Sequence, residues 1–368
     1  MLLPLLIAAA LTPLPPPPVV AERPMIAWIA DTATCNGTPV APTAMRRPFV
    51  SLGWTDTIRA EPLILRFRID AEGRPLSIAQ APDTPGTYTN RPSPSDVAPS
   101  LAASRFAAGT PREGCEISYR LRVTPLAETP VEDLISYTLA PDAGTLPKPG
   151  WDRIMPADGT CANEPRPQPL VRVLPDFAKL AGTPGAREWT MIGYDTDAGG
   201  RPIAVRIPYG THNRVLDAAA VKAMKESRFT EGARTGCLYP YYRNPEIMPA
   251  PAMADPAATP QGQCPGGQAA WATPPRLIYP EPFRRRSIEG WAIVGFDVAP
   301  WGEVGNVRVL AAEPAAAFGE QAMQMLRTAR KAASQTGSTG CVERIRFAMG
   351  RPGDTLPPDA ASDAPPPF

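Results

Sequence analysis

The residues best able to do chemistry in this chain of 368 residues are its cysteines and its single histidine. The six cysteines are Cys35, Cys115, Cys161, Cys237, Cys264 and Cys341. None of them forms the close C-x-x-C pair typical of a structural zinc site, and a cysteine nucleophile would have only His212 as its base. We therefore expect neither a metal nor another cofactor, and we interpret the cysteines as disulfides formed in an oxidising compartment.

Other catalytic patterns are missing from the sequence as well. It has no Gly-x-Ser-x-Gly elbow, no phosphate-binding loop of the Walker type and no acidic cluster at metal-ligand spacing. Asp195 and Asp197 flank an expected turn, where Asp is an ordinary residue, and Asn213 can cap a helix that follows it. We predict no catalytic residues and a protein that is not an enzyme.

Charge and hydropathy indicate the cellular location. Lys and Arg number 37 and Asp and Glu number 36, so no overall field directs the protein to nucleic acid. Residues 1–21 hold no charged side chain, and their apolar run at 2–11 is too short to span a bilayer comfortably. We interpret them as a signal peptide, or as a short anchor and the one membrane contact if they are not removed. The expected location is the periplasm or cell envelope.

The cysteines fall into three successive pairs separated by 80, 76 and 77 positions, which indicates an internal repeat. A glycine follows strand-like sequence inside each pair, at Gly73, Gly200 and Gly302. The word Ser104-Arg105-Phe106 recurs as Ser227-Arg228-Phe229, and a glycine precedes each second cysteine. The repeat selects the disulfides Cys35 to Cys115, Cys161 to Cys237 and Cys264 to Cys341. Each loop closure would contribute about 4 kcal/mol in the chain-entropy model.

Periodicity inside one repeat predicts its structure. In the third copy, alternating apolar residues at 292–298, the turn at Gly302 and a resumed strand form a β-hairpin. Helical spacing follows at 318–329, and alternation at 345–349 gives a returning strand. We predict an α+β protein of three tandem modules, each an antiparallel three-stranded sheet with a helix on one face and one disulfide within the module. Pro240 should make the last strand of the second copy short or place it at an edge.

Boundaries follow from these markers and from the distribution of proline. The expected order is the N-terminal segment at 1–21, module 1 at 22–125, a connector at 126–157, module 2 at 158–246, a Pro/Ala-rich linker at 247–262, module 3 at 263–350 and a disordered tail at 351–368. Within the connector, Val131–Leu139 is apolar enough for a short strand or a short helix.

The third module contains, in this order, Tyr279-Pro280, Gly290, the hairpin, Gly302 and the helix that contains Phe318. This pattern resembles the C-terminal domain of TonB-type energy transducers. The second module matches through its helix and Ser227-Arg228-Phe229, and the divergent first module joins through its likeness to the second. A full transducer also has a transmembrane helix and a long Pro-rich spacer, and neither is evident here. The paired cysteines are not part of the family pattern.

The resemblance implies a periplasmic domain whose sheet edge takes up an extended peptide of an outer-membrane receptor, by β-augmentation. By position, that edge is at residues 342–349, with Val342, Arg344, Arg346 and Ala348 as contact residues; otherwise the arginines are an ordinary solvated strand face. The implied role is accessory to TonB-dependent transport. An alternative is a scaffolding or cell-wall-binding protein that contacts peptidoglycan through Trp291, Trp301 and Tyr279, unless these aromatics are packed in the core or in turns.

Overall fold

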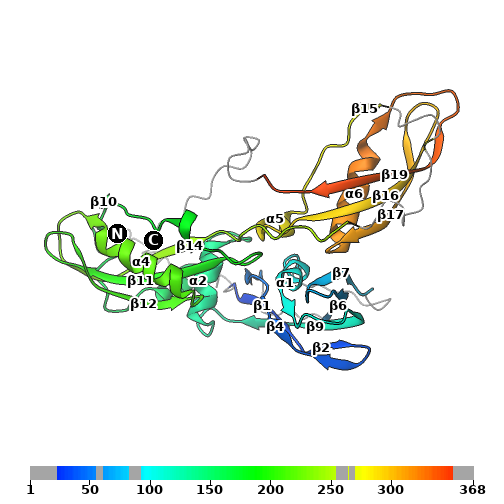
Figure 1. Cartoon of the computed structure of the whole chain (residues 1–368). Coiled ribbons are helices and arrows are strands. Elements are labelled where there is room, and N and C mark those ends of the chain that lie inside the picture. Colours follow the sequence, from blue (N-terminus) through cyan, green and yellow to red (C-terminus); the bar gives the residue numbers. More distant parts are fainter. Residues whose placement is uncertain (1–22, 55–60, 83–92, 254–263, 265–269, 351–368) are drawn as a thin grey trace, which may run out of the picture.

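The computed structural model describes residues 23–54, 61–82, 93–253, 264 and 270–350 (Figure 1). We call β1 to β9 with α1 the first unit, β10 to β14 with α4 the second unit, and β15 to β19 with α5 and α6 the third unit. Helices α2 and α3 stand between the first two units in the chain. The predicted N-terminal segment at 1–21 and tail at 351–368 lie outside the described residues, as does most of the predicted linker.

The third unit is an antiparallel sheet in the order β17-β16-β19, with α6 packed on one face. Its elements are β15 (Trp271–Thr273), α5 (Glu281–Arg285), β16 (Gly290–Val298), β17 (Val304–Glu313), α6 (Ala316–Thr328), β18 (Arg330–Lys331) and β19 (Ser338–Phe347). Alternation along β16 directs Ala292, Val294 and Phe296 into the core beneath α6. The short strand β15 pairs with β18, a ladder that the sequence did not predict.

The second unit repeats this arrangement with the order β12-β11-β14. Its elements are β10 (Pro169–Val171), the 3-10 helix at Phe177–Lys179, β11 (Glu188–Thr196), β12 (Pro202–Gly210), α4 (Arg214–Glu226), β13 (Arg228–Phe229) and β14 (Arg234–Arg243). Asn213 caps α4, since its Oδ1 accepts bonds from Val215 N (3.1 Å) and Leu216 N (3.2 Å). Strand β14 lies at the sheet edge, but it is not short: it pairs with β11 from Arg243 to Arg234 despite Pro240.

The first unit has a larger sheet than the predicted three strands. Its elements are β1 (Met25–Ala30), β2 (Ala33–Cys35), β3 (Thr38–Val40), β4 (Pro42–Ala44), β5 (Ser51–Leu52), β6 (Leu63–Ile69), β7 (Pro75–Gln80), α1 (Val97–Ala103), β8 (Arg105–Phe106) and β9 (Arg112–Thr124). The hairpin β6-β7 pairs with one side of β9, and β1 and β2 pair with the other. The prediction of three strands is wrong here because β9, at 13 residues, carries two further partners along its second side.

All three units share the same turn. Gly73, Gly200 and Gly302 have φ values of +77°, +74° and +87°, a region that favours glycine. A Cβ at these positions would lie 2.1–2.2 Å from the carbonyl oxygen of Phe106, Phe229 and Lys331 respectively. The amides of those three residues donate back to the three glycine oxygens at 2.9–3.0 Å. The recurring glycines are therefore required by both conformation and close approach.

The three predicted disulfides are confirmed. The glycine before each second cysteine has a positive φ, of 61° at Gly114, 68° at Gly236 and 69° at Gly340. Two of these amides donate to an aspartate on the neighbouring strand, Gly236 N to Asp195 Oδ1 (2.8 Å) and Gly340 N to Asp297 Oδ1 (2.7 Å). Asp195 thus holds the third strand, whereas Asp197 is the turn residue that the sequence predicted and accepts a bond from Arg201 N (2.8 Å).

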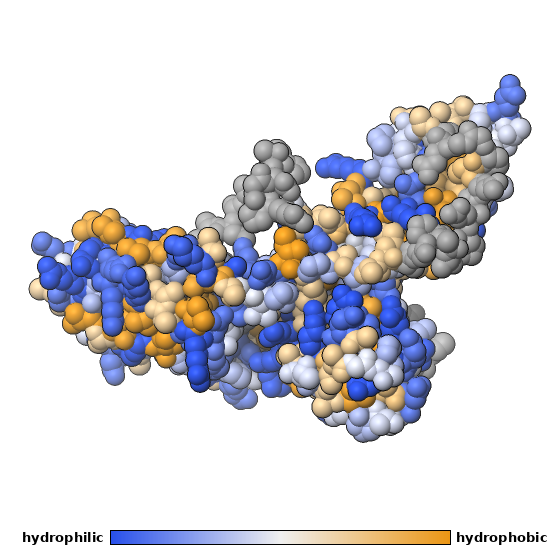
Figure 2. Space-filling view, viewed as in Figure 1, coloured by the Kyte–Doolittle hydropathy of each residue, from blue (hydrophilic) through white to orange (hydrophobic). Residues whose placement is uncertain are grey.

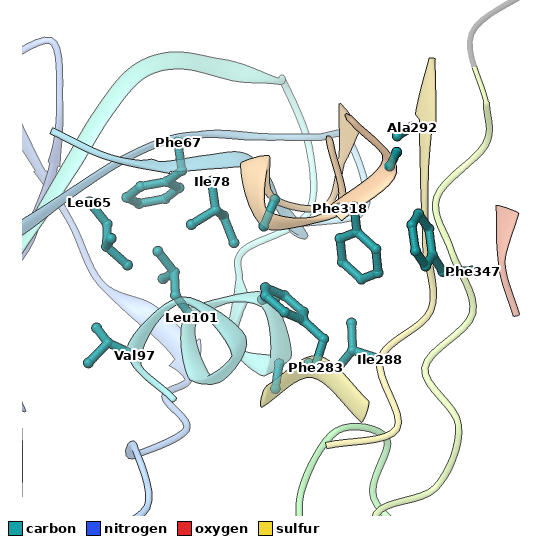
Figure 3. Packing of buried hydrophobic residues seen from close by; sticks show 14 of the residues in the cluster. Leu65, Phe67, Ile78, Val97, Leu101, Phe283, Ile288, Ala292, Phe318 and Phe347 are labelled. Carbon is teal, nitrogen blue, oxygen red and sulfur yellow. The ribbon is translucent and has the colours of Figure 1, made fainter. Parts of the chain in front are cut away.

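The first and third units share one hydrophobic core (Figure 3). Val97 and Leu101 of α1 lie on one side, and Phe283 of α5 and Phe318 of α6 lie on the other. Strand β7 meets the end of β17, where Ile78 N donates to Pro314 O (2.9 Å). The two units are thus in direct contact, although the second unit separates them in the sequence.

A buried ion pair joins the same two units. The Arg286 guanidinium donates to both Asp96 carboxylate oxygens, from Nε at 2.7 Å and Nη2 at 2.5 Å, and its side chain is 2% exposed. It also donates to the carbonyl oxygens of Arg47 (2.8 Å) and Gly185 (3.1 Å) and lies 4.1 Å from the centre of the Phe49 ring. Gly185 precedes β11, so residues from all three parts of the chain meet at this guanidinium.

The predicted connector is a packed element. Helices α2 (Val131–Leu139) and α3 (Lys148–Ile154) form a second core with β1 of the first unit and β11 of the second. The segment Val131–Leu139, left open as strand or helix from its sequence, is a helix with Leu134 and Ile135 fully buried. Apolar contacts therefore fix the second unit to the first.

Replacing Arg286 by Met should lower the free energy of unfolding by about 3–5 kcal/mol, because Asp96 would remain as a buried, unpaired charge. Denaturant unfolding of the oxidised chain measures this change. The matched control is Arg284→Met, which removes an exposed pair with Glu281 and should cost less than about 1 kcal/mol. Equal losses for the two variants would contradict the assignment of Asp96 and Arg286 as the central contact.

Replacing Gly302 by Ala should destabilise the third unit by about 3 kcal/mol or more, since the new Cβ meets the Lys331 carbonyl and φ is positive. Gly305→Ala is the control, because no atom lies within 4 Å of its Cβ position. Thermal unfolding compares the two variants. A Gly302→Ala protein as stable as the Gly305→Ala protein would show that the turn is not needed.

Candidate functional site

The predicted contact residues lie on an outer strand of the third sheet. Strand β19 pairs with β16 along one side, and among the described residues no strand pairs with its other side. Cys341, Ile345 and Phe347 are buried toward α6, whereas Arg346 is exposed and Val342 and Arg344 are half-buried. Ala348, just beyond the end of β19, is exposed. Backbone donors and acceptors on an outer strand can pair with an added strand.

Both ends of β19 are fixed by side chains. At its start, Asp297 accepts the Gly340 amide, and the Asn306 side-chain bond together with that amide lowers the pKa of Asp297. Beyond its end, Met349 N donates to Glu289 Oε1 (2.8 Å) and the Tyr279 hydroxyl donates to Phe347 O (3.2 Å). Both ends of the strand are therefore held against β16 and its flanking residues before any partner binds.

The residues that carried the family resemblance gather at this end of the sheet. The Tyr279 hydroxyl shares its one proton between Phe347 O and the nearer Ile288 O (2.7 Å), and its ring lies edge-on to the rings of Phe318 and Phe347. A Cβ on Gly290 would lie 2.6 Å from the Phe318 ring. Pro280 precedes α5 as its N-cap. Gly302, at the hairpin turn, is the one motif residue that lies elsewhere.

Two residues of opposite charge, Lys331 of β18 and Glu343 of β19, interact electrostatically. Lys331 is 3% exposed, and its ammonium lies 3.7 Å from the centre of the Trp271 ring. Burial raises the pKa of Glu343 on β19, and the charge of Lys331 opposes that shift. Burial also lowers the pKa of Lys331. Ionised Glu343 therefore costs folding free energy near neutral pH.

A cavity of about 420 Å³ lies at the end of β19. Its walls are residues 249–253, residues 289–291 and residues 346–348. The Trp291 indole donates to Pro251 O (2.9 Å), and Met248 N donates to Ser287 O (2.8 Å). The described start of the predicted linker is thus bound to the third unit and contributes to the wall of the cavity.

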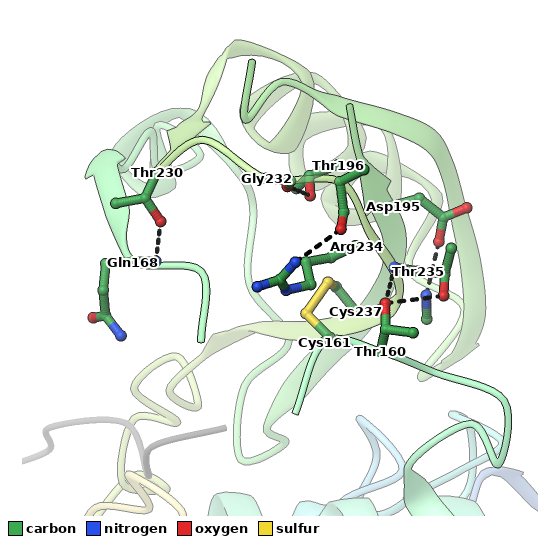
Figure 4. Close-up of a disulfide and its surroundings, with 12 residues drawn as sticks. Thr160, Cys161, Gln168, Asp195, Thr196, Thr230, Gly232, Arg234, Thr235 and Cys237 are labelled. Atoms are coloured by element: carbon green, nitrogen blue, oxygen red, sulfur yellow. Dashed lines mark hydrogen bonds between the residues drawn. A yellow bond between two sulfur atoms is a disulfide. The ribbon is translucent and has the colours of Figure 1, made fainter. Parts of the chain in front are cut away.

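The strands that correspond to β19 in the other units have different surroundings. In the first unit, β1 and β2 already pair with the second side of β9. In the second unit, Thr160 binds the start of β14 through bonds to Thr235 N and O, both at 2.9 Å (Figure 4). Farther along β14, Pro240 lacks the N–H that an added strand would use.

The aromatic residues considered for polymer binding do not form a platform. Trp291 is 4% exposed, and the Tyr279 hydroxyl is used internally. Trp301 is 65% exposed at the hairpin turn and donates to Glu303. On the face shown in Figure 2, apolar and hydrophilic side chains are intermingled over the second unit, at the left. Over the second unit, the visible side chains thus form no contiguous apolar surface of the kind that marks a large interface.

Residues 275–348 match the family model described as Gram-negative bacterial TonB protein C-terminal. The third unit carries a TonB C-terminal domain. The match runs from before α5 to just past the end of β19, so it contains the outer strand and the cluster around Tyr279. No curated protein matches the chain. Within the described residues, no helix is both long and apolar enough to cross a membrane.

Sequence reasoning found β19 but missed two other features of the fold. It assigned residues 247–262 to a linker, although 249–253 line the cavity and Met248 is buried. It also missed β1, because Met25, Ile26, Ala27 and Trp28 are all buried and show no alternation of apolar and polar residues. A run of that kind fits a buried strand or a buried helix equally well.

Substituting Glu343 by Gln should raise the stability of the chain at pH 7. Because the folded pKa of Glu343 exceeds its ordinary value of 4.5, its contribution to stability is complete below 4.5 and is lost as the pH rises through the folded pKa. The advantage of the variant should therefore shrink on going from pH 7 to pH 4 in denaturant unfolding. Exposed Glu320→Gln on α6 is the control, and a pH-independent difference would contradict the burial of Glu343.

Proposed function

We propose that this chain is a non-catalytic protein of the periplasm or cell envelope whose third unit binds an extended peptide of an envelope partner, of the outer-membrane receptor type. The observation that carries the proposal is that β19, within the TonB C-terminal domain, has a strand partner on one side only among the described residues. Strand addition needs backbone groups and not reactive side chains. All six cysteines are in disulfides, which supports a non-catalytic role.

The proposal assigns binding to the third unit and structural roles to the other two. The outer side of β9 is covered by β1, and Pro240 interrupts the donors of β14. Strand β19 holds no proline and has Arg344 and Arg346 on the face away from α6. In an accessory role of this kind, the protein would present one peptide-binding edge on a rigid scaffold.

We also propose that the three units are copies of one module. Support comes from the identical glycine turn, from the disulfide at the same place in each unit, and from the bonds of the recurring word. Ser104 Oγ donates to Ser100 O and Ser227 Oγ donates to Ala223 O, both at 2.9 Å. Burial of Trp291 and the internal hydrogen bonding of the Tyr279 hydroxyl give the alternative of cell-wall binding less support.

Arg344→Pro tests strand addition at the backbone. Pro240 stands at the corresponding place in β14, which keeps its ladder with β11, so the variant should fold while losing one outward donor. Peptides are first selected from a random displayed library for binding to the full oxidised chain. They should bind the Arg344→Pro variant at least about tenfold more weakly than the unchanged chain. Arg344→Ala keeps the N–H and should lose less than about threefold.

Hydrogen exchange locates the bound peptide. Selected peptides should protect amides of 342–347, and sedimentation with purified sacculi should leave the protein in solution. The full chain is used because the third unit shares its core with the first. Selected peptides that protect no β19 amide, or co-sedimentation with sacculi, would refute the proposal.

A further inference from the structure

The first unit contains a strand bound at the place that corresponds to the end of β19 and the three residues after it. Strand β1 runs antiparallel to β9 from Met25 opposite Thr124 to Ala30 opposite Tyr119. Asp31 N adds a bond to Ser118 O (2.8 Å). Since Cys115 and Cys341 occupy the same place in their units, β1 shows how an extended segment sits on this edge.

Side chains of β1 show what the edge can recognise. Met25 and Ala27 are buried on the face away from α1, and Ile29 packs against the same cluster. At the end of the strand, the Asp31 carboxylate pairs with Arg120 of β9. The bound segment therefore combines alternate apolar residues on one face with an acidic residue at its end.

One of these positions has the same chemistry on β19. Arg346 stands five residues after Cys341, as Arg120 does after Cys115. In the first unit Ile29 lies opposite Arg120 and Ala27 lies opposite Arg122. The corresponding residues, Arg346 of β19 and Ala348 just after its end, line the cavity of about 420 Å³ together with Trp291. In the first unit, Ala27 and Ile29 opposite these positions pack into the core that includes α2, whereas in the third unit a cavity lies there.

The wall of this cavity is preformed. Trp291 lies opposite Arg346 on the sheet face away from α6, and its N–H is satisfied by Pro251 O. Most of the remaining wall is apolar, and the charged groups are Glu289, which accepts the Met349 amide, and Arg346. An apolar side chain can enter without leaving the indole N–H or the Glu289 carboxylate unpaired.

We propose that the cavity is a side-chain subsite of the β19 edge. It takes an apolar residue of an extended peptide that also carries an acidic residue beside Arg346, in the pattern of residues 25–31 of this chain. This inference rests on the proposed function, because it names the peptide that β19 binds.

The probe is a labelled synthetic peptide with the sequence of residues 24–31, added to the full oxidised chain and followed by fluorescence anisotropy. The Arg346→Glu variant should bind this peptide at least about tenfold more weakly than the unchanged protein does. A peptide that carries Asp31→Lys should bind the Arg346→Glu variant with the original affinity. Ala348→Trp, which fills the cavity, should weaken binding of the peptide at least about tenfold. The same variant should have a smaller effect on the binding of a peptide in which Gly replaces Ala27 and Ile29.

Hydrogen exchange should place this peptide on β19. Absence of binding, protection of β9 in place of β19, or no charge-swap rescue would overturn the subsite. Library peptides that protect β19 but are unaffected by Arg346→Glu and Ala348→Trp would overturn it while leaving the proposed function intact. If no library peptide protects β19, the proposed function fails and the subsite fails with it.

Discussion

The ion pair between Arg286 and Asp96 sets the arrangement of the whole chain. Arg286 follows α5, within the TonB C-terminal domain, and Asp96 is the N-cap of α1 in the first unit. A guanidinium removed from water is stable only when its donors are met, and here they are met by a carboxylate and two carbonyl oxygens. The surrounding geometry must be kept for all of these bonds to form together. The pair therefore fixes the relative positions of segments that are distant in the sequence.

A second contact fixes the orientation of the same two units. The Glu313 carboxylate at the end of β17 is 6% exposed and accepts bonds from Arg68, at 2.7 Å, and from the amide and hydroxyl of Ser77, at 2.6 and 2.7 Å. These bonds join the third unit to the first unit through β17 on one side and the β6-β7 hairpin on the other. Strand β19 lies on the opposite side of its sheet from β17, so the packing of the units leaves the candidate edge uncovered by the first unit.

Local patterns allowed much of each unit to be predicted from the sequence. Cysteine spacing predicted the disulfides, and the glycine, the apolar alternation and the helical spacing predicted hairpin, helix and returning strand. These signals are short-range or strictly repeated. The third unit's family assignment followed from the same residues.

Contacts between segments distant in the sequence could not be predicted in this way. Arg284, Arg285 and Arg286 are consecutive and chemically identical, and only tertiary packing decides that Arg286 is the buried one. The pairing of β1 with β9 leaves no periodic signal, since both faces of β1 are covered. The cavity depends on Pro249–Pro251 folding back onto Trp291, and a Pro/Ala-rich composition alone is typical of a linker.

The core shared by the first and third units has a consequence for biogenesis. A polypeptide emerges from the ribosome amino-terminus first, so α1 is made long before Phe283 and Phe318, which cover Val97 and Leu101. Until those residues have been synthesised, the nascent chain exposes the apolar surface of α1, which favours aggregation. A chaperone that binds unfolded chains would be most useful during that interval. Premature termination anywhere in the second unit would yield a fragment whose apolar surface stays exposed.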